Sequence, residues 1–136
     1  MGELETTLMR WLIDTNVWID APAGRADAEN VLKRARDQDV TWAGYCVITL
    51  VESLGFAHLT KNEDLAFRKI FSEFYEVPIT SEIIEQAILI RKNVRIKTPD
   101  SLIAASAIIS SATLITRNLS GFKNIPNLQV AGTDQV

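Results

Sequence analysis

Three acidic residues, Asp14, Glu52 and Asp100, stand at positions from which a folded chain could bring carboxylates together. Asp14 directly follows the apolar run 11–13 (WLI), which is typical of a strand buried on both faces. Glu52 and Asp100 each fall in the first turn of a predicted helix. In an open α/β sheet, the carboxyl ends of parallel strands face the crevice where ligands bind. We therefore expect the three carboxylates to meet at one edge of such a sheet.

Carboxylates that converge in this way need a compensating positive charge. Left bare at low dielectric they would repel one another strongly, so such a cluster implies a bound cation or a raised pKa. Oxygen ligands without histidine or cysteine select a hard ion, Mg²⁺ or Mn²⁺. Asn118 follows another predicted strand and would lie at the same edge. An ion held there would explain how a protein of net charge −3 could bind phosphate.

Each acid also has a purely structural interpretation. Asp14 could cap a helix that begins near Val17, because aspartate often accepts hydrogen bonds from the free amides of a first turn. Glu52 lies three residues after Thr49, the spacing of a capping box. An acid in the first turn of a helix, such as Asp100, interacts favourably with the helix dipole. The functional hypothesis therefore depends on all three acids being placed together.

Length and composition indicate a single globular domain over residues 1–136. Hydrophobic residues make up 47% of the chain and charged residues 23%. No apolar run approaches the ~18 residues of a membrane span. The opening MGELETTLMR has no apolar core, so we expect no secretory signal there, and Met9 could be the natural start with 1–8 an extension. A single cysteine, Cys46, allows neither an internal disulfide nor a cysteine-based metal site, which favours a cytoplasmic setting.

Strand and helix signals alternate along the chain. This alternation predicts an α/β three-layer sandwich, in which helices flank a short central, mainly parallel sheet. Two consecutive helices without an intervening strand are expected to project from the sheet as a helical hairpin over 49–74. The predicted strands are 11–13, 40–43, 76–79, 113–116 and 128–131, and a polar loop is expected over 117–121.

Four positive charges fall within seven residues just before Thr98, Pro99 and Asp100. Such a run is often a solvated helix end stabilised by the negative end of the helix dipole. Its position next to a candidate ligand also suggests that it steers phosphate, with Arg91 and Lys97 as substrate-binding residues.

Four segments of the chain, LIDTNVWID, TLVESLGF, KTPDSLIAASAI and LITRNLSGF, resemble in this order the successive motifs of PIN-domain ribonucleases. Within that family the small single domain is most similar to VapC-type toxins of toxin–antitoxin pairs. The resemblance implies that Asp14, Glu52 and Asp100 are the principal metal-binding acids. Asn16 matches the polar residue that follows the first acid. The polar fourth motif is matched by Thr116 and Asn118.

The resemblance also implies a function, namely Mg²⁺- or Mn²⁺-dependent endonucleolytic cleavage of single-stranded RNA that leaves a 5′-phosphate. Asp14 and Asp100 would bind the ion directly, and Glu52 would bind it or orient the attacking water. A homodimer is implied, as is an antitoxin whose tail occupies the acidic groove. The apolar hairpin over 49–74 is the expected docking place for that antitoxin.

The chain departs from the family pattern at Gly121, where many relatives carry a further aspartate directly before the phenylalanine. With three carboxylates and an amide, we expect one well-held ion, and a second that arrives with substrate. The missing acid leaves open a catalytically weak module that only binds RNA or protein. A phosphatase or phosphotransferase with Asp14 as nucleophile is a further alternative, although Asn16 stands where such enzymes often carry a second acid.

Overall fold

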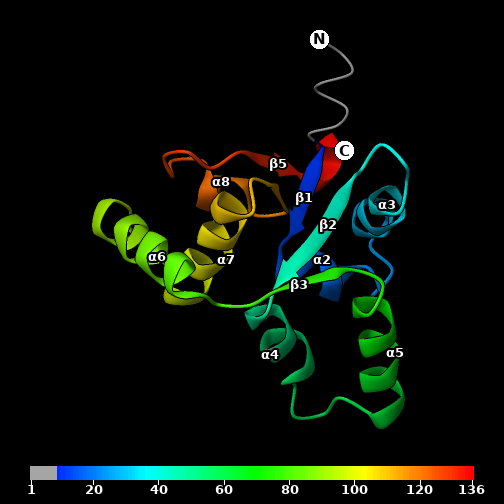
Figure 1. Ribbon diagram of the computed structural model, residues 1–136. Helices are drawn as coiled ribbons and strands as arrows, with labels where there is room; N and C mark the ends of the chain where they lie inside the picture. Colours follow the sequence, from blue (N-terminus) through cyan, green and yellow to red (C-terminus); the bar gives the residue numbers. More distant parts are fainter. Residues whose placement is uncertain (1–8) are drawn as a thin grey trace.

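The computed structural model describes residues 9–136 and contains a five-stranded sheet in the order β3-β2-β1-β4-β5 (Figure 1). All four neighbouring pairs of strands are parallel, which confirms the α/β class and makes the sheet fully rather than mainly parallel. The proposed extension over 1–8 lies outside the described residues. The strands are β1 (Arg10–Ile13), β2 (Trp42–Cys46), β3 (Tyr75–Val77), β4 (Thr113–Thr116) and β5 (Val130–Gly132).

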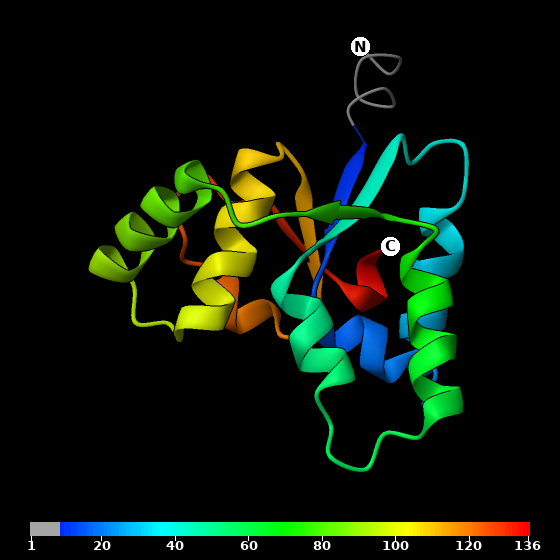
Figure 2. The same ribbon diagram turned by 60° about the horizontal axis from the view of Figure 1, so that its bottom comes forward.

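Helices cover both faces of the sheet, which gives the three layers that the sequence predicts (Figure 2). Residues of α2, α3 and α5 pack on one face, and residues of α6, α7 and α8 pack on the other. Among residues 9–136, no helix has both the length and the apolar character to cross a membrane. The helices are α2 (Thr15–Asp20), α3 (Ala26–Ala35), α4 (Ile48–Leu54), α5 (Lys61–Phe71), α6 (Ser81–Asn93), α7 (Thr98–Ile109) and α8 (Leu119–Phe122), and a 3₁₀ turn covers Thr133–Gln135.

The central strands are buried on both faces because their side chains alternate between two apolar cores. In β1, Trp11 and Ile13 pack into the core beside α2 and α3, and Leu12 packs into the core beside α7. In β4, Ile115 and Leu114 divide in the same way. Two-sided burial is what an unbroken apolar run in a parallel sheet predicts.

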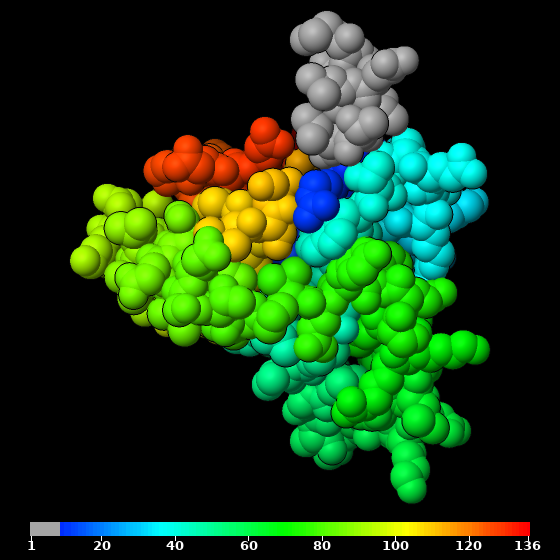
Figure 3. Space-filling view, viewed as in Figure 1, coloured from blue at the N-terminus to red at the C-terminus, as the bar shows by residue number. Residues whose placement is uncertain are grey.

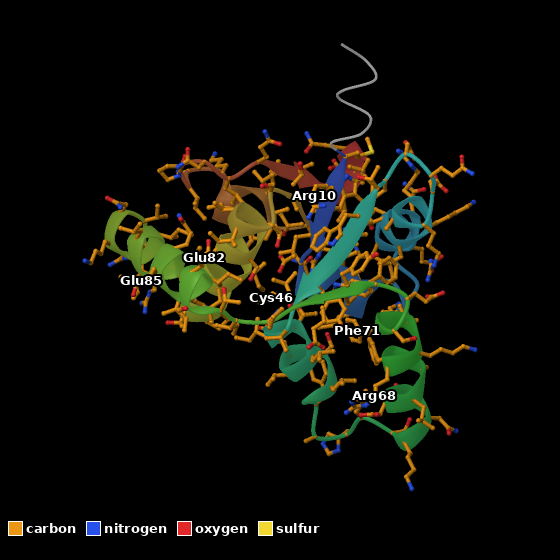
Figure 4. The ribbon with its side chains drawn as sticks, in the orientation of Figure 1. Arg10, Cys46, Arg68, Phe71, Glu82 and Glu85 are labelled. Atoms are coloured by element: carbon orange, nitrogen blue, oxygen red, sulfur yellow. The ribbon has the colours of Figure 1, made fainter. Side chains whose placement is uncertain are left out.

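The hairpin of α4 and α5 extends beyond the carboxyl end of β2 (Figure 1), and its teal to green surface projects from the lower part of the molecule in Figure 3. Phe71 lies at the end of α5 nearest the sheet, where its ring contacts Trp18 and Tyr45, whereas Arg68 lies one turn earlier (Figure 4). Phe67, Ile70 and Phe74 pack around the same core. The hairpin is therefore joined to the core through the carboxyl-terminal end of α5 and the residues after it.

Candidate active site

Asp14 lies between the end of β1 and the start of α2, and this residue is only 5% exposed. Its Oδ1 accepts a hydrogen bond from the backbone N–H of Thr15 at 2.8 Å. Its Oδ2 accepts bonds from the Thr116 hydroxyl at 2.7 Å and from Asn16 Nδ2 at 3.2 Å. The helix thus begins at Thr15 and not near Val17, and Asp14 caps it. Capping does not exclude a role in a site, because the same carboxylate also borders a cavity.

A cavity of about 350 Å³ opens at the carboxyl end of β1, where α2, α4 and α7 meet it. All three predicted acids line this cavity, and so do Asn16 and Asn118. Side chains separated by up to 104 positions, from Asp14 to Asn118, therefore face one space, as the parallel topology predicts. The full lining is Asp14, Thr15, Asn16, Ile19, Glu52, Phe56, Asp100 and Asn118.

Burial raises the pKa values of two of these acids, Asp14 and Asp100. The pKa of Asp14 is raised to about 6, mainly because burial removes the carboxylate from water. Hydrogen bonds from Thr116 and Thr15 oppose this shift, and the negative charges of Asp100 and Glu52 add to it. Burial also raises the pKa of Asp100, although the nearby charge of Lys97 acts in the opposite direction. The acids are thus close enough to influence one another electrostatically.

Glu52 is held by a residue that is distant in the sequence rather than by its own helix. Its Oε1 accepts a hydrogen bond from the Thr15 hydroxyl at 2.7 Å, and the Thr15 and Thr49 hydroxyl oxygens lie 2.8 Å apart. The capping-box interpretation is wrong, because α4 begins at Ile48, with Thr49 fully buried inside the helix. The helix begins two residues earlier than a cap at Thr49 requires, so Glu52 lies beyond its first turn. Sequence analysis did not select Thr15 or Thr49, since nothing local shows that these two hydroxyls meet.

The two predicted residues of the fourth motif have different roles: Thr116 holds Asp14 in place, and Asn118 faces the cavity. Thr116 is fully buried, donates to Asp14 and accepts the backbone N–H of Asn118 at 3.0 Å. Asn118 itself lines the cavity. The expected polar loop over 117–121 is wrong, because α8 begins at Leu119. Burial of Phe122 in the core draws this segment against the sheet.

The two predicted basic residues lie in different surroundings. Arg91 donates from Nη1 to the Thr98 hydroxyl at 2.8 Å and from Nε to the Ile96 carbonyl at 3.2 Å, so it closes the turn between α6 and α7. Lys97 occupies the position before the first residue of α7 and acts on the pKa of Asp100. Of the two basic residues, Lys97 is the one whose charge acts on an acid of the site. Arg91 does not line the cavity.

The donor set fits a partly hydrated hard cation. Within residues 9–136, no three side chains of histidine, cysteine, aspartate or glutamate gather closely enough to hold an ion by themselves. Mg²⁺ does not require such a cage, because it usually keeps several waters and binds through one or two carboxylates. Asp14 and Asp100, both with raised pKa values and both facing the cavity, would gain most from a cation between them.

Comparison with known proteins relates this geometry to one family. The family model of the PIN domain matches residues 11–128. The structure resembles a chain of a toxin–antitoxin complex from Klebsiella pneumoniae (30% identity, TM-score 0.77, covering 92% of this chain and 98% of that chain). A chain of VapBC2 from Rickettsia felis, bound to a promoter DNA fragment, gives 25% identity and a TM-score of 0.75 over 91% and 98% of the two chains. A chain of VapBC-1 from nontypeable Haemophilus influenzae, at 24% identity and a TM-score of 0.71 over 93% and 99% of the two chains, shares the fold. No curated protein matches the sequence.

Proposed function

The chain belongs to the PIN-domain family of nucleases, and from this premise we propose that it is a metal-dependent endoribonuclease of single-stranded RNA, acting as the toxin of a toxin–antitoxin pair. The observation that carries the proposal is the cavity at the carboxyl end of β1, into which Asp14, Glu52 and Asp100 all face. Carboxylates brought together at the edge of a parallel sheet are suited to a hard cation, and such a cation is suited to phosphate.

Asp14 and Asp100 would hold Mg²⁺ or Mn²⁺ directly. When bound, the ion would lower the pKa of a water and polarise a phosphoryl oxygen. Glu52 would bind it as well or orient the attacking water, and the Thr15 hydroxyl fixes one of its oxygens for this role. Thr116 orients Asp14, and it does so from a fully buried position. Asn16 and Asn118 would contact the substrate at the cavity wall.

An antitoxin partner is supported by a second, apolar cavity of about 350 Å³ beside the first. Ile19 and Phe56 line both cavities, so a peptide seated in the apolar one would reach directly into the acidic one. The apolar cavity lies between α2 and the hairpin of α4 and α5, and its lining also includes Leu59 and Phe67. Known structures of the same fold are toxin–antitoxin complexes. We propose that the antitoxin docks on this hairpin and that its tail covers the acids.

A homodimer is a further part of the proposal. Helix α6 exposes Ile84, Ile88 and Leu89 to solvent, and exposed apolar side chains grouped on one helix often mark an interface. This helix packs on α7, which carries Asp100.

Purified protein should cleave single-stranded RNA in Mg²⁺ or Mn²⁺, release 5′-phosphate ends and lose activity in EDTA. A protein that binds RNA normally and never cleaves it would favour the binding module. Recovery of phosphorylated Asp14 would favour the aspartate-nucleophile enzyme.

Replacing Glu52 with glutamine should lower the cleavage rate about 10- to 100-fold, the usual cost of disturbing a residue that orients a metal ligand or its water. In the wild type, Glu52 accepts a hydrogen bond from the Thr15 hydroxyl at 2.7 Å. Glutamine keeps an oxygen that can accept this bond, so the fold should persist. Initial rates at saturating Mg²⁺ would measure the change, with Glu63→Gln as an exposed control on α5. An unchanged rate in Glu52→Gln would remove Glu52 from the mechanism.

We expect one tightly bound ion because position 121 carries a glycine and not a further acid. A Cβ atom at this position would lie 2.5 Å from Nδ2 of Asn118, so the Asn118 amide occupies the space that a larger residue would need. Gly121→Asp should displace this amide, add a carboxylate and strengthen a second Mn²⁺ site about tenfold, because affinity rises with the charge of the ligands. Calorimetric titration would show the stoichiometry rising from one ion to two. Gly121→Ala, which displaces Asn118 without adding charge, should keep one ion; if both variants behave alike, the missing acid does not limit metal binding.

A further inference from the structure

The backbone of Arg117 lies beside the candidate active site, although Arg117 does not itself line the cavity. It lies between Thr116, which binds Asp14, and Asn118, which lines the acidic cavity. Its own backbone N–H donates to Oδ1 of Asn16 at 3.4 Å, and Asn16 lines the same cavity. The origin of the Arg117 side chain is therefore fixed at the rim of the space that the acids face.

The guanidinium of Arg117 is held by Asp20, the last residue of α2. Nε of Arg117 lies 2.8 Å from Oδ2 of Asp20, and the Asp20 side chain is only 17% exposed. The Arg117 side chain is 47% exposed, and the contact with Asp20 is made through Nε, on the inner edge of the guanidinium. Asp20 thus holds the guanidinium through Nε, and about half of the Arg117 side chain remains open to solvent and to a ligand.

A polyanion that approaches three carboxylates needs nearby positive charge. Lys97 supplies some on the α7 side, where it lowers the pKa of Asp100. Arg117 supplies it on the α2 side. Arg25 also lies near Asp20, at 3.9 Å, but it is engaged more closely by Asp27 at 3.0 Å. Of the two arginines beside Asp20, Arg117 is the one that is attached to the cavity wall.

We propose that Arg117 binds a backbone phosphate of the RNA next to the cleaved bond, and that Asp20 is the positioning residue that orients its guanidinium. The planar guanidinium donates two parallel hydrogen bonds to phosphate, which suits a fixed group at a cavity rim. This inference rests on the proposed nuclease function and adds a substrate contact that the sequence motifs do not assign. The competing interpretation is that the ion pair only ties the segment after β4 to α2, a role in which exposed pairs contribute little to stability.

The test measures RNA binding separately from cleavage. Fluorescence anisotropy of a short single-stranded RNA is recorded at several salt concentrations with Asp100→Asn protein, so that no substrate is consumed. Adding Arg117→Gln should weaken binding about tenfold and reduce the slope of log K against log salt by about 0.7, the loss of one phosphate contact. Arg117→Lys should restore the slope but only part of the affinity, because lysine keeps the positive charge but lacks the two parallel N–H donors of the guanidinium. Arg25→Gln, the matched control beside the same aspartate, should leave the slope unchanged.

Asp20→Asn distinguishes orientation from charge. It should weaken binding about threefold while leaving the salt slope at the wild-type value, because the guanidinium keeps its charge and loses only its fixed direction. In otherwise wild-type protein, Arg117→Gln should raise KM and change kcat by less than about twofold.

Three results would overturn the proposal or its premise. If Arg117→Gln lowers the melting temperature but leaves the affinity and the salt slope unchanged, the ion pair is only structural. If Arg25→Gln changes the slope as much as Arg117→Gln does, the contact is a general charge effect. If the wild type binds RNA through Arg117 and fails to cleave it with any divalent ion, the nuclease function fails while the phosphate contact stands.

Discussion

Asp14→Asn is expected to lower RNA cleavage by at least about 1,000-fold and, at the same time, to stabilise the metal-free protein above pH 6. The loss of activity follows because Asp14 is the most buried of the three acids and would hold the ion directly. Metal ions contribute several kcal/mol of transition-state stabilisation, and about 4 kcal/mol corresponds to a factor of about 1,000 in rate. Asparagine has nearly the same shape, so the fold is retained.

The gain in stability follows from the pKa of Asp14. Its folded pKa of about 6 lies above the ordinary aspartate value of 3.8, so the folded protein binds this proton more tightly than the unfolded chain does. The contribution of Asp14 to stability is then most favourable below about pH 4, declines as the pH rises through 6 and is lost above it. The shift corresponds to about 3 kcal/mol of unfolding free energy, and the raised pKa of Asp100 acts in the same direction.

Urea unfolding of both proteins in EDTA at pH 5 and pH 8 measures this effect. Asp14→Asn removes the buried charge but replaces one acceptor oxygen with an NH2 group, so at least one of the bonds from Thr15, Thr116 and Asn16 is lost. A net gain of about 1–2 kcal/mol is expected at pH 8. Saturating Mg²⁺ should stabilise the wild type and leave the variant nearly unchanged. Asp37→Asn, at an exposed ion pair with Arg34, serves as a control. If the free energy of unfolding changes equally between pH 5 and pH 8 in the wild type and in Asp14→Asn, Asp14 is not the carboxylate whose pKa is raised by folding.

The features that sequence analysis predicted well are those with a local cause. The apolar run before Asp14 and the run TLIT mark two buried strands, and the second was predicted with its observed bounds, Thr113–Thr116. Because parallel strands end at one edge, the order of strands and helices sufficed to bring Asp14, Glu52 and Asp100 to one cavity.

The features that it missed depend on contacts between distant residues. The partner of Glu52 is Thr15, 37 positions earlier, and no local rule selects it over the capping box. Strand β2 continues to Cys46 through Gly44, although glycine is unfavourable in strands. A Cβ atom at Gly44 would lie 2.6 Å from the Tyr75 carbonyl oxygen, so the close approach of β3 explains this glycine.

The site depends on a helix of only six residues, α2, which is too short to be stable by itself. Trp18 attaches this helix to the sheet. Its side chain is 1% exposed and its Nε1 donates to the Ile13 carbonyl at 3.1 Å. Its ring contacts those of Tyr45, Phe71 and Phe74, at centroid distances of 5.6, 4.8 and 5.1 Å. The residue that fixes α2 is thus also the centre of the aromatic core that joins the sheet to α5.

Trp18→Ala should therefore lower the free energy of unfolding by about 3–5 kcal/mol, the cost of removing a large buried ring and leaving a cavity. Trp18→Phe keeps most of the ring and loses the bond to Ile13, so it should cost about 1 kcal/mol for that bond and somewhat more for the smaller cavity. Urea denaturation followed by circular dichroism measures both. Trp42→Ala is the matched control, because Trp42 is only partly buried and stacks on the exposed ring of Tyr75 at 5.7 Å. If Trp18→Ala costs no more than Trp42→Ala, the aromatic core does not hold α2, and another contact must fix the position of Asp14.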